Sequence, residues 1–273
     1  MRIPLAGAIV LVTGGASGIG KEMAIGATHR GAKHVIIWDI DEDGGEAVVR
    51  EIESFGGHVS FYHVNLLDPE AITSTGEQVL ADLGRVDVLI NSAGIVTGKH
   101  FLDLTDDDVT RTFGLNTFAL YRTTRIFLPG MLERGKGSVV TIASAAGLVG
   151  VARQTDYSAS KFAATGFNES LRAELHHSGH DLHTLIVQPY YINTGMFDGV
   201  ETKYSSLLPI LETDEVAAKV LDAIEAGRQS LVLPPFAALI KLLKILPVPL
   251  HDKLCDLFGI NSTMDDFTGR KRN

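Results

Sequence analysis

The sequence predicts an α/β protein built on a doubly wound, seven-stranded parallel sheet with helices on both faces. Short apolar runs rich in β-branched residues recur along the chain, and segments with helical periodicity separate most of them. This alternation is typical of βαβ units, and a glycine-rich turn after the first run is typical of the first such unit. We expect strands at Ala8–Thr13, His34–Trp38, Val59–His63, Val86–Ile90, Ser138–Ile142, Thr184–Gln188 and Ser230–Leu233, and helices at Lys21–His29, Gly44–Phe55, Pro69–Leu83 and Lys161–His176.

The composition excludes several classes of protein. Of the 273 residues, 45% are hydrophobic and 21% are charged, as in folded soluble domains, so a disordered chain is excluded. The formal net charge is −9, and nucleic acid is therefore not an expected partner. The single cysteine, Cys255, forms no internal disulfide and favours a reducing, cytoplasmic location. No apolar run reaches the roughly 20 residues of a membrane-spanning helix.

The first element is a buried strand that leads into a glycine-rich turn. Residues Ile3 to Val12 are almost wholly apolar, but they lack a small-residue cleavage site and so fit a buried strand better than a signal peptide. The turn from Thr13 to Gly20 reads TGGASGIG and opens the next helix. Glycines there let the backbone approach a pyrophosphate, which binds the N–H groups of the helix N-terminus. The turn predicts a dinucleotide site, although its Gly-x-x-x-Gly-x-Gly spacing differs from the usual Gly-x-Gly-x-x-Gly.

An acidic residue closes the second strand. Asp39 follows Val35 to Trp38, about 20 residues after the glycines. A carboxylate there accepts hydrogen bonds from the adenosine ribose hydroxyls and repels a 2′-phosphate, so we expect NAD rather than NADP. Asp41 and its acidic neighbours leave a simpler alternative open, in which Asp39 is one more exposed acidic residue of this loop.

A tyrosine and a lysine lie one helical turn apart, at Tyr157 and Lys161. Side chains four positions apart on a helix share a face, so the phenol and the ammonium group project together. A fixed cation favours the phenolate, which moves the phenol toward use as a base. Ser144 ends the fifth strand, at the edge where open parallel sheets place their ligands.

Taken together, these motifs resemble the short-chain dehydrogenase/reductase family from about residue 5 to residue 233. The resemblance implies a Rossmann-type fold and an NAD(P)-dependent alcohol dehydrogenase or ketoreductase, with the cofactor supplying the redox chemistry. The residues that carry it are Thr13-Gly14-x-x-x-Gly18-x-Gly20, Asp39, Asn91-Ser92-Ala93-Gly94, Asn116, Ser144, Tyr157-x-x-x-Lys161 and the segment from Pro189 to Thr194.

The resemblance also implies a catalytic tetrad of Asn116, Ser144, Tyr157 and Lys161. Tyr157 would act as the general acid or base on the substrate oxygen, and Ser144 would hydrogen-bond that oxygen. Lys161 would lower the phenol pKa and bind the nicotinamide ribose. Asn116 would hold a water that links Lys161 to solvent.

The cofactor site implied by the resemblance departs from the family pattern at three positions. Ser92 stands where a second Asn is usual, and Asn65 replaces the Asp that commonly faces the adenine, although an amide oxygen accepts the same hydrogen bond. Tyr190 replaces the glycine of the usual Pro-Gly pair. Ile192 and Thr194 would hold the nicotinamide carboxamide. The implied cofactor residues are Gly14, Ser17, Gly18, Ile19, Gly20, Asp39, Ile40, Asn65, Leu66, Asn91, Ala93, Gly94, Tyr157, Lys161, Pro189, Ile192 and Thr194.

The substrate side is expected to be apolar. In the family, the segment at about 195–212 folds over the site as a lid, and here it holds no cluster of Lys or Arg for a phosphate or carboxylate. Hydrophobic secondary alcohols and their ketones fit such a pocket. The expected pocket residues are Ala146, Tyr190, Tyr191, Met196 and Phe197.

Residues 234–273 form a C-terminal extension of the same domain, whose catalytic part is 1–233. We expect one helix of about a dozen residues between Pro235 and Pro247, carrying Lys241 and Lys244 and too short to span a bilayer. It would contact a membrane surface through 234–250, cover the pocket, or pack on a partner subunit. This tail resembles a branch of retinol and hydroxysteroid dehydrogenases. That branch typically carries an N-terminal anchor, which we do not expect here, so the resemblance points to lipophilic substrates more than to a location.

Other functions remain as alternatives. A sugar-nucleotide epimerase or dehydratase of the same fold usually has a larger C-terminal domain, and a non-catalytic NAD-binding scaffold on a lipid surface would lack a tetrad residue. The histidines from His176 to His183 have no matching carboxylates, so no metal is expected. By resemblance we expect a homodimer or homotetramer, with helices around Thr110–Phe127 and Tyr157–His176 at the interface.

Overall fold

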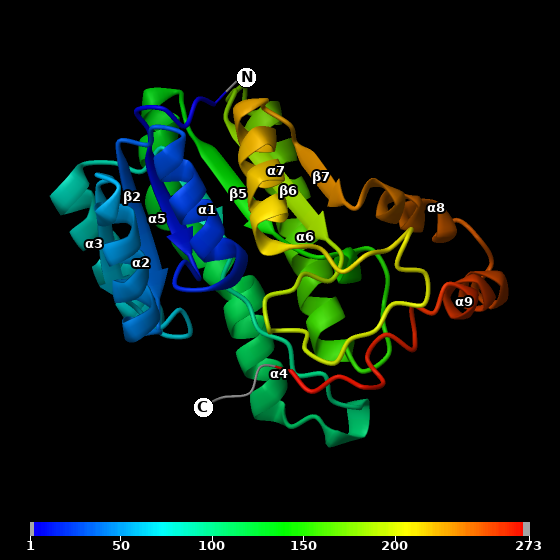
Figure 1. The fold of residues 1–273 in the computed structure, drawn as a ribbon. Coiled ribbons are helices and arrows are strands. Elements are labelled where there is room, and N and C mark those ends of the chain that lie inside the picture. The colour runs from blue at the N-terminus through cyan, green and yellow to red at the C-terminus, as the bar shows by residue number, and fades with distance from the viewer. Residues whose placement is uncertain (1–2, 270–273) are drawn as a thin grey trace.

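The computed structural model describes residues 3–269 and confirms the doubly wound parallel sheet (Figure 1). The strand order is β3-β2-β1-β4-β5-β6-β7, and every pair is parallel. All seven predicted strands are present. They are β1 (Ile9–Thr13), β2 (His34–Asp39), β3 (Val59–His63), β4 (Val88–Asn91), β5 (Ser138–Ile142), β6 (His183–Pro189) and β7 (Ser230–Leu233). The helices are α1 (Gly18–His29), α2 (Glu42–Ser54), α3 (Pro69–Leu83), α4 (Asp106–Phe113), α5 (Ala119–Arg134), α6 (Thr155–His177), α7 (Thr213–Glu225), α8 (Ile240–Leu243) and α9 (Val248–Leu257).

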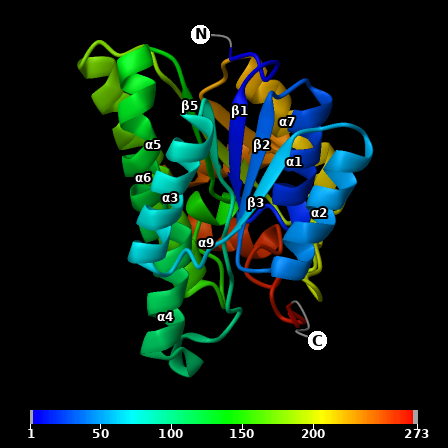
Figure 2. The ribbon, with the colours of Figure 1, turned by 90° about the vertical axis from the view of Figure 1, so that its left-hand side faces the viewer.

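Helices cover both faces of the sheet. Figure 2 shows α1, α2 and α7 on one side and α3, α5 and α6 on the other. The strand side chains divide between the two layers with the period of two that a pleated strand requires. In β1, Val10 and Val12 pack in one apolar core while Ile9 and Leu11 pack in the other. Burial on both faces explains why these strands are continuous apolar runs.

Local capping determines where the helices begin. Asp41 caps α2, because its carboxylate accepts a hydrogen bond from the Gly44 N–H at 3.0 Å. The helix therefore starts at Glu42, two residues before the predicted start. Helix α6 starts at Thr155 rather than at Lys161, so Tyr157 lies in its first turn.

A π-helical turn, η2 (Gly114–Phe118), joins α4 to α5. Such one-turn bulges place side chains off the regular α-helical spacing and are frequent at functional sites. Asn116 lies at the centre of this turn and is buried.

The tail differs from the single predicted helix of about a dozen residues. It forms a 3₁₀ turn, η4 (Pro235–Leu239), then the one-turn helix α8, and a second helix, α9, begins after Pro247. Proline disfavours a helical conformation in the residue before it, so Pro247 separates α8 from α9. Among residues 3–269, no helix is long and apolar enough to cross a membrane.

Candidate active site

Two adjoining cavities open where the parallel strands end. The first, which we call the long cleft, contains about 1040 Å³ of empty space and runs from the glycine turn past Asp39 to Met196. The second, which we call the apolar pocket, contains about 840 Å³ and lies around Tyr157. Both are partly open to solvent. They meet at a shared border of Ile19, Ser92, Gly94, Thr194 and Met196.

The glycine turn forms the floor of the long cleft. Gly14 and Gly18 have φ of +70° and +55°, a region that residues with a Cβ rarely adopt. A Cβ on Gly14 would lie 2.8 Å from the Ala93 Cα, and a Cβ on Gly20 would overlap the Gly14 carbonyl. Only glycine fits at Gly14 and Gly20, so these two residues let the turn pack closely against Ala93 and against its own backbone at the start of α1.

Asp39 faces this turn from the end of β2. One carboxylate oxygen accepts a hydrogen bond from the Ala16 N–H at 3.0 Å. The other accepts from the N–H groups of Ile40 and Asp41, at 2.8 and 3.1 Å. These bonds fix the carboxylate at the wall of the long cleft and leave lone pairs for hydroxyl donors.

Most of the predicted cofactor residues line the two cavities. Asn65 lies in the long cleft, where its amide oxygen already accepts from the Leu67 N–H at 3.0 Å. Asn91 lines neither cavity, because its side-chain oxygen accepts from the Thr123 hydroxyl at 2.7 Å inside the core. The prediction did not include Arg111 and Leu115, which also line the cleft.

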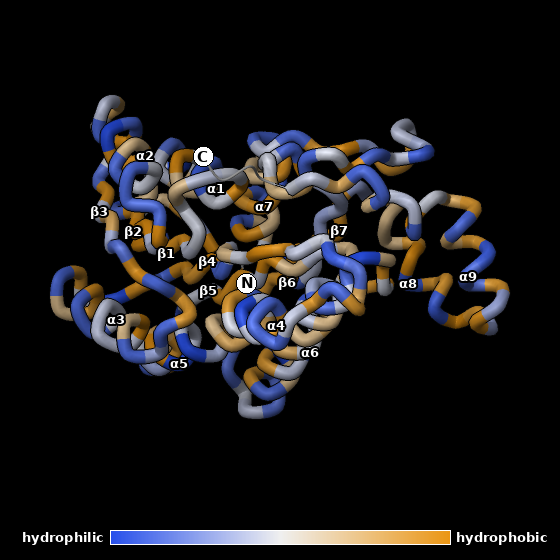
Figure 3. The backbone as a smooth tube through the Cα atoms, turned by 90° about the horizontal axis from the view of Figure 1, so that it is seen from below, coloured by the Kyte–Doolittle hydropathy of each residue, from blue (hydrophilic) through white to orange (hydrophobic). Residues whose placement is uncertain are grey.

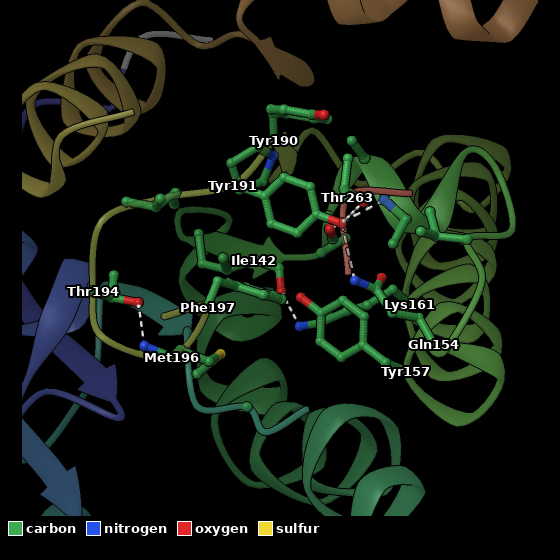
Figure 4. Close-up of a pocket in the computed structure, with 18 of the residues that line it drawn as sticks. Ile142, Gln154, Tyr157, Lys161, Tyr190, Tyr191, Thr194, Met196, Phe197 and Thr263 are labelled. Carbon is green, nitrogen blue, oxygen red and sulfur yellow. Dashed lines mark hydrogen bonds between the residues drawn. The ribbon is translucent and has the colours of Figure 1, made fainter. Parts of the chain in front are cut away.

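Three of the four predicted catalytic side chains gather in the apolar pocket. Ser144, at the end of β5, and Tyr157 and Lys161, on α6, all line it. The Lys161 Nζ lies 5.6 Å from the centre of the Tyr157 ring and donates a hydrogen bond to the Ile142 carbonyl at 3.0 Å. Figure 4 shows this bond beside the Tyr157 ring.

Burial controls the protonation of this pair. It raises the pKa of the Tyr157 phenol above 10.0, and the hydrogen bond with Ser144 only partly opposes the shift. Burial also lowers the pKa of the Lys161 ammonium from 10.5 to about 8. Loss of hydration is the largest cause of the Tyr157 shift, so the phenol pKa is raised here, opposite to the lowering by Lys161 that we expect from the sequence.

Asn116, the fourth predicted catalytic residue, hydrogen-bonds both the loop after β4 and helix α6. Its amide NH₂ donates to the Ile95 carbonyl at 2.9 Å and to the Ser160 hydroxyl at 3.0 Å, and its oxygen accepts from the Ile95 N–H at 2.9 Å. A Cβ on Gly94 would lie 3.1 Å from the Asn116 oxygen and 3.4 Å from the Lys161 Nζ. The π-helical turn thus brings Asn116 close to Lys161 with its amide group already bonded to protein.

The five predicted substrate residues all line the apolar pocket. Figure 4 labels Tyr190, Tyr191, Met196 and Phe197 there. Tyr191 and Phe197 stack edge-to-face at 5.0 Å, and Phe197 meets the Tyr157 ring at 5.8 Å. The backbone of Tyr191 and of Asn193 pairs with Leu211, which ties together the two ends of the segment that carries Phe197. Aromatic rings therefore wall the space beside the reactive phenol.

The tail also contributes to this pocket, through residues that the sequence did not single out. Ile240, Ile260 and Thr263 line it. Thr263 accepts or donates a hydrogen bond of 2.7 Å with the Tyr191 hydroxyl, which also accepts from the Gln154 amide at 3.1 Å. The apolar character of the tail was the only signal for these contacts.

Asp156 is a further residue that the motifs did not reveal. Its buried carboxylate accepts hydrogen bonds from the hydroxyls of Thr97, at 3.0 and 3.1 Å, and of Thr112, at 2.9 Å. These bonds join the loop after β4 and helix α4 to the residue that precedes Tyr157. The network fixes the first turn of α6 at the site.

The geometry fits a dinucleotide. The long cleft offers the glycine turn at the N-terminus of α1 for a pyrophosphate and the Asp39 carboxylate for ribose hydroxyls, and it continues into the apolar pocket. A ligand bound along it would reach from Asp39 to Lys161. In contrast, residues 3–269 contain no cluster of His, Cys, Asp or Glu suited to a metal ion.

Comparison with known proteins agrees with this geometry. Residues 8–205 match the family model described as short chain dehydrogenase. Epidermal retinol dehydrogenase 2 of Mus musculus is 38% identical over 274 residues, which cover 99% of this chain and 88% of the relative. 17-beta-hydroxysteroid dehydrogenase 13 of Homo sapiens is 34% identical over 251 residues, covering 90% and 81%.

Solved structures agree as well. A short-chain dehydrogenase/reductase from Burkholderia phymatum, solved in complex with NAD, has a TM-score of 0.80 at 23% identity and covers 89% of this chain and 95% of its own. A metagenomic short-chain oxidoreductase in complex with NADP has a TM-score of 0.70 at 28% identity, covering 84% and 96%. This chain is thus an oxidoreductase of the short-chain dehydrogenase/reductase family, and within that family it resembles the branch of retinol and hydroxysteroid dehydrogenases.

Proposed function

We propose that this protein is an NAD-dependent oxidoreductase that interconverts a hydrophobic secondary alcohol and its ketone. The observation that carries the proposal is the position of Tyr157. Its phenol lies in the apolar pocket with Ser144, and Lys161 lies one helical turn away, where the pocket meets the long cleft. A proton-transfer group, an apolar substrate space and a nucleotide-shaped cleft therefore meet at one point.

In the oxidation direction, Tyr157 acts as its phenolate and takes the proton of the substrate hydroxyl, and Ser144 donates a hydrogen bond to the substrate oxygen. A nicotinamide cofactor bound along the long cleft would supply the redox chemistry, as the acceptor of a hydride from the carbinol carbon. Lys161 holds a positive charge below its pKa of about 8 and favours the phenolate during the transfer. Reduction runs through the same groups in reverse.

The preference for NAD rests on Asp39. Its carboxylate lies at the wall of the long cleft, oriented by three backbone N–H groups, where it would accept ribose hydroxyls and repel a 2′-phosphate. The structural relatives were solved with NAD in one case and with NADP in the other. The carboxylate of Asp39 is the feature that favours NAD in this chain.

The proposed substrates are lipophilic. Aromatic and aliphatic side chains dominate the apolar pocket, and Lys161 is the only cationic residue among those described that line it. The names of the relatives, a retinol dehydrogenase and a 17-beta-hydroxysteroid dehydrogenase, support alcohols of this kind. A steroid- or retinol-type activity at a membrane surface is the alternative; retinol is a primary alcohol, so its product would be an aldehyde rather than a ketone.

We also propose a cytoplasmic homodimer or homotetramer. Val109 on α4, Phe118 in η2, Tyr121 on α5 and Phe162 on α6 are large apolar side chains that remain 36–49% exposed. They lie on the helices that the sequence analysis assigns to an interface. Association of two copies through these helices would cover them.

The test is NADH formation by the purified protein from about pH 7, where Lys161 is charged, to about pH 9, where release of a proton favours alcohol oxidation, with NAD and NADP offered separately. We expect rates that rise from 2-propanol through aryl and long-chain alcohols to steroids and retinol, with NAD only. Tyr157→Phe is the control, and we expect it to lose at least about 10³-fold in turnover while cofactor still binds. If NAD binds but no alcohol of the panel is oxidised, the result would support a non-catalytic scaffold. Activity in the Tyr157→Phe variant would contradict the role of Tyr157 as the base.

A further inference from the structure

Three polar side chains in the wall of the apolar pocket form a hydrogen-bonded chain. Gln154, Tyr191 and Thr263 all line the pocket, and none belongs to the predicted tetrad. Gln154 immediately precedes α6, Tyr191 follows β6, and Thr263 lies in the segment after α9. Figure 1 and Figure 3 show α9 at the β7 end of the molecule, and in Figure 1 the red segment after it runs back toward α4. The chain therefore joins three distant parts of the sequence at the pocket.

The hydrogen bonds of this chain run in one direction. The Thr263 hydroxyl donates its single proton to the Ile260 carbonyl at 2.9 Å, so its oxygen accepts from the Tyr191 hydroxyl at 2.7 Å. Burial raises the pKa of the Tyr191 phenol to about 12, so this hydroxyl keeps the proton that it donates. With that proton used, the Tyr191 oxygen accepts from the Gln154 amide NH₂ at 3.1 Å. The direction of the chain therefore orients the Gln154 amide with its nitrogen, and not its oxygen, toward Tyr191.

The far end of the chain is an unpaired acceptor. Gln154 is fully buried, and its side-chain oxygen has no hydrogen-bond partner among the residues that the structure describes. Buried polar atoms in folded proteins nearly always have a partner, because an unpaired one costs free energy of folding. Since Gln154 lines the apolar pocket, a molecule bound there can supply the missing donor.

This acceptor belongs to the same turn of helix as the proposed base. Gln154 is the N-cap residue of α6, and Tyr157 follows three positions later. Side chains with this spacing lie about one helical turn apart on the same side of the helix. A group that bonds Gln154 is therefore expected on the substrate close to the carbon that reacts at Tyr157.

We propose that Gln154 is a specificity-determining residue and that the preferred substrate is a lipophilic alcohol with a second hydroxyl near the carbinol that is oxidised. This inference rests on the proposed function and narrows its substrate class. The second group is a donor, because the unpaired atom of Gln154 is an acceptor. An ether, a ketone or a carboxylate in that place offers acceptors alone and would leave the Gln154 oxygen unpaired.

The test uses aryl secondary alcohols that carry a terminal hydroxyl at increasing distance from the carbinol. They are 1-phenylethane-1,2-diol, 1-phenylpropane-1,3-diol and 1-phenylbutane-1,4-diol, each compared with its terminal methyl ether, which keeps the oxygen and loses the proton. We measure NAD-linked kcat/KM for formation of the aryl ketone. For at least one of the three pairs, the wild type should favour the diol over the ether at least about tenfold.

The main variant is Gln154→Met, which replaces the amide with an apolar side chain of nearly the same length. Its diol-to-ether ratio should fall to about one, because neither compound finds an acceptor. A preference caused by the bulk of the ether methyl group would instead persist in this variant.

Two further variants complete the comparison. Val151→Ala changes an apolar residue that lines the same pocket and should leave the diol-to-ether ratio unchanged. Tyr191→Phe removes the hydroxyl that orients the amide, so the ratio should fall although Gln154 is retained. Tyr191→Phe also replaces Gln154→Met in the test if the latter does not fold.

Two results would overturn the inference. The wild type could oxidise the diol and the ether of every pair equally well, as expected if an ordered water satisfies Gln154. The ratio could also stay unchanged in Gln154→Met, or fall as far in Val151→Ala.

Absence of turnover with every alcohol would count against the proposed function and not against the role of Gln154. In that case, calorimetry of the same pairs with the protein and NAD decides the inference. Binding of a diol at least about tenfold tighter than its ether supports it, and equal affinities for all pairs overturn it.

Discussion

The long cleft and the apolar pocket share a border that includes Gly94, Thr194 and Met196, but most of their walls come from different parts of the chain. The cleft lies at the ends of strands, where backbone groups of the glycine turn and the fixed carboxylate of Asp39 form its surface. The pocket is walled by side chains from the segments after β5 and β6 and from the tail. The first surface depends on close backbone contacts that tolerate few substitutions. The second can change its shape by side-chain substitution without altering the sheet.

The largest effect is expected at the border of the two regions, from Lys161→Met. Turnover should fall about 10²- to 10³-fold, because the cation beside Tyr157 is lost. The free energy of unfolding should rise, because burial lowers the pKa of the Lys161 ammonium in the folded protein to about 8, below its ordinary value of 10.5. Burial of the cation therefore disfavours folding below pH 8, and this cost declines as pH rises from 8 to 10.5.

At pH 7 the gain in free energy of unfolding should be about 2 kcal/mol, after subtracting the lost hydrogen bond to Ile142. Denaturant titrations at pH 7 and about pH 10 measure it. Lys219→Met is the control, since that lysine is half exposed and pairs only with Glu215 at the surface. An equal gain at both pH values would contradict the burial argument.

The next prediction concerns the cofactor preference, which depends on the long cleft alone. Asp39→Ser should raise the ratio of NADP-linked to NAD-linked kcat/KM by about tenfold, because removal of the carboxylate relieves its repulsion of a 2′-phosphate. Asp43→Ser changes a nearby acidic residue of α2 and should leave the ratio almost unchanged. If both variants shift it equally, the general acidity of the loop discriminates, and Asp39 has no special role.

The smallest predicted effect concerns the KM for the alcohol, which depends on the apolar pocket alone. Thr263→Val removes the hydroxyl that bonds Tyr191, so KM for the alcohol should rise about threefold or more while KM for NAD stays constant. Thr268→Val is the control, because that hydroxyl is exposed and lies outside the pocket. A change in the KM for NAD would show that the two regions are not separable.

The parts of the molecule that depend on short-range chemistry were predictable from the sequence. The strands follow from apolar runs. The cleft follows from glycines at positions where a Cβ would clash with neighbouring backbone atoms. The Tyr157–Lys161 pair follows from helical spacing. These features need only local sequence and the general geometry of parallel sheets.

The remaining parts depend on contacts between distant segments. Nothing near Thr263 in sequence indicates that it bonds Tyr191, and nothing near Asp156 indicates two threonine donors from other elements. The tail was expected as one helix, because its apolar pattern was clearer than the effect of Pro247. Burial likewise reversed the expected shift of the Tyr157 pKa, since desolvation depends on the assembled site.

The tail contacts also mean that the apolar pocket is completed late in synthesis of the chain. Ile260 and Thr263 are synthesised after every strand of the sheet, whereas the glycine turn and Asp39 emerge within the first 40 or so residues. During translation, the nucleotide side can therefore form while the wall beside Tyr157 is still incomplete. The last residues of the long cleft, Thr194 and Met196, are thus made well before Ile260 and Thr263 of the apolar pocket, so the two surfaces are completed one after the other.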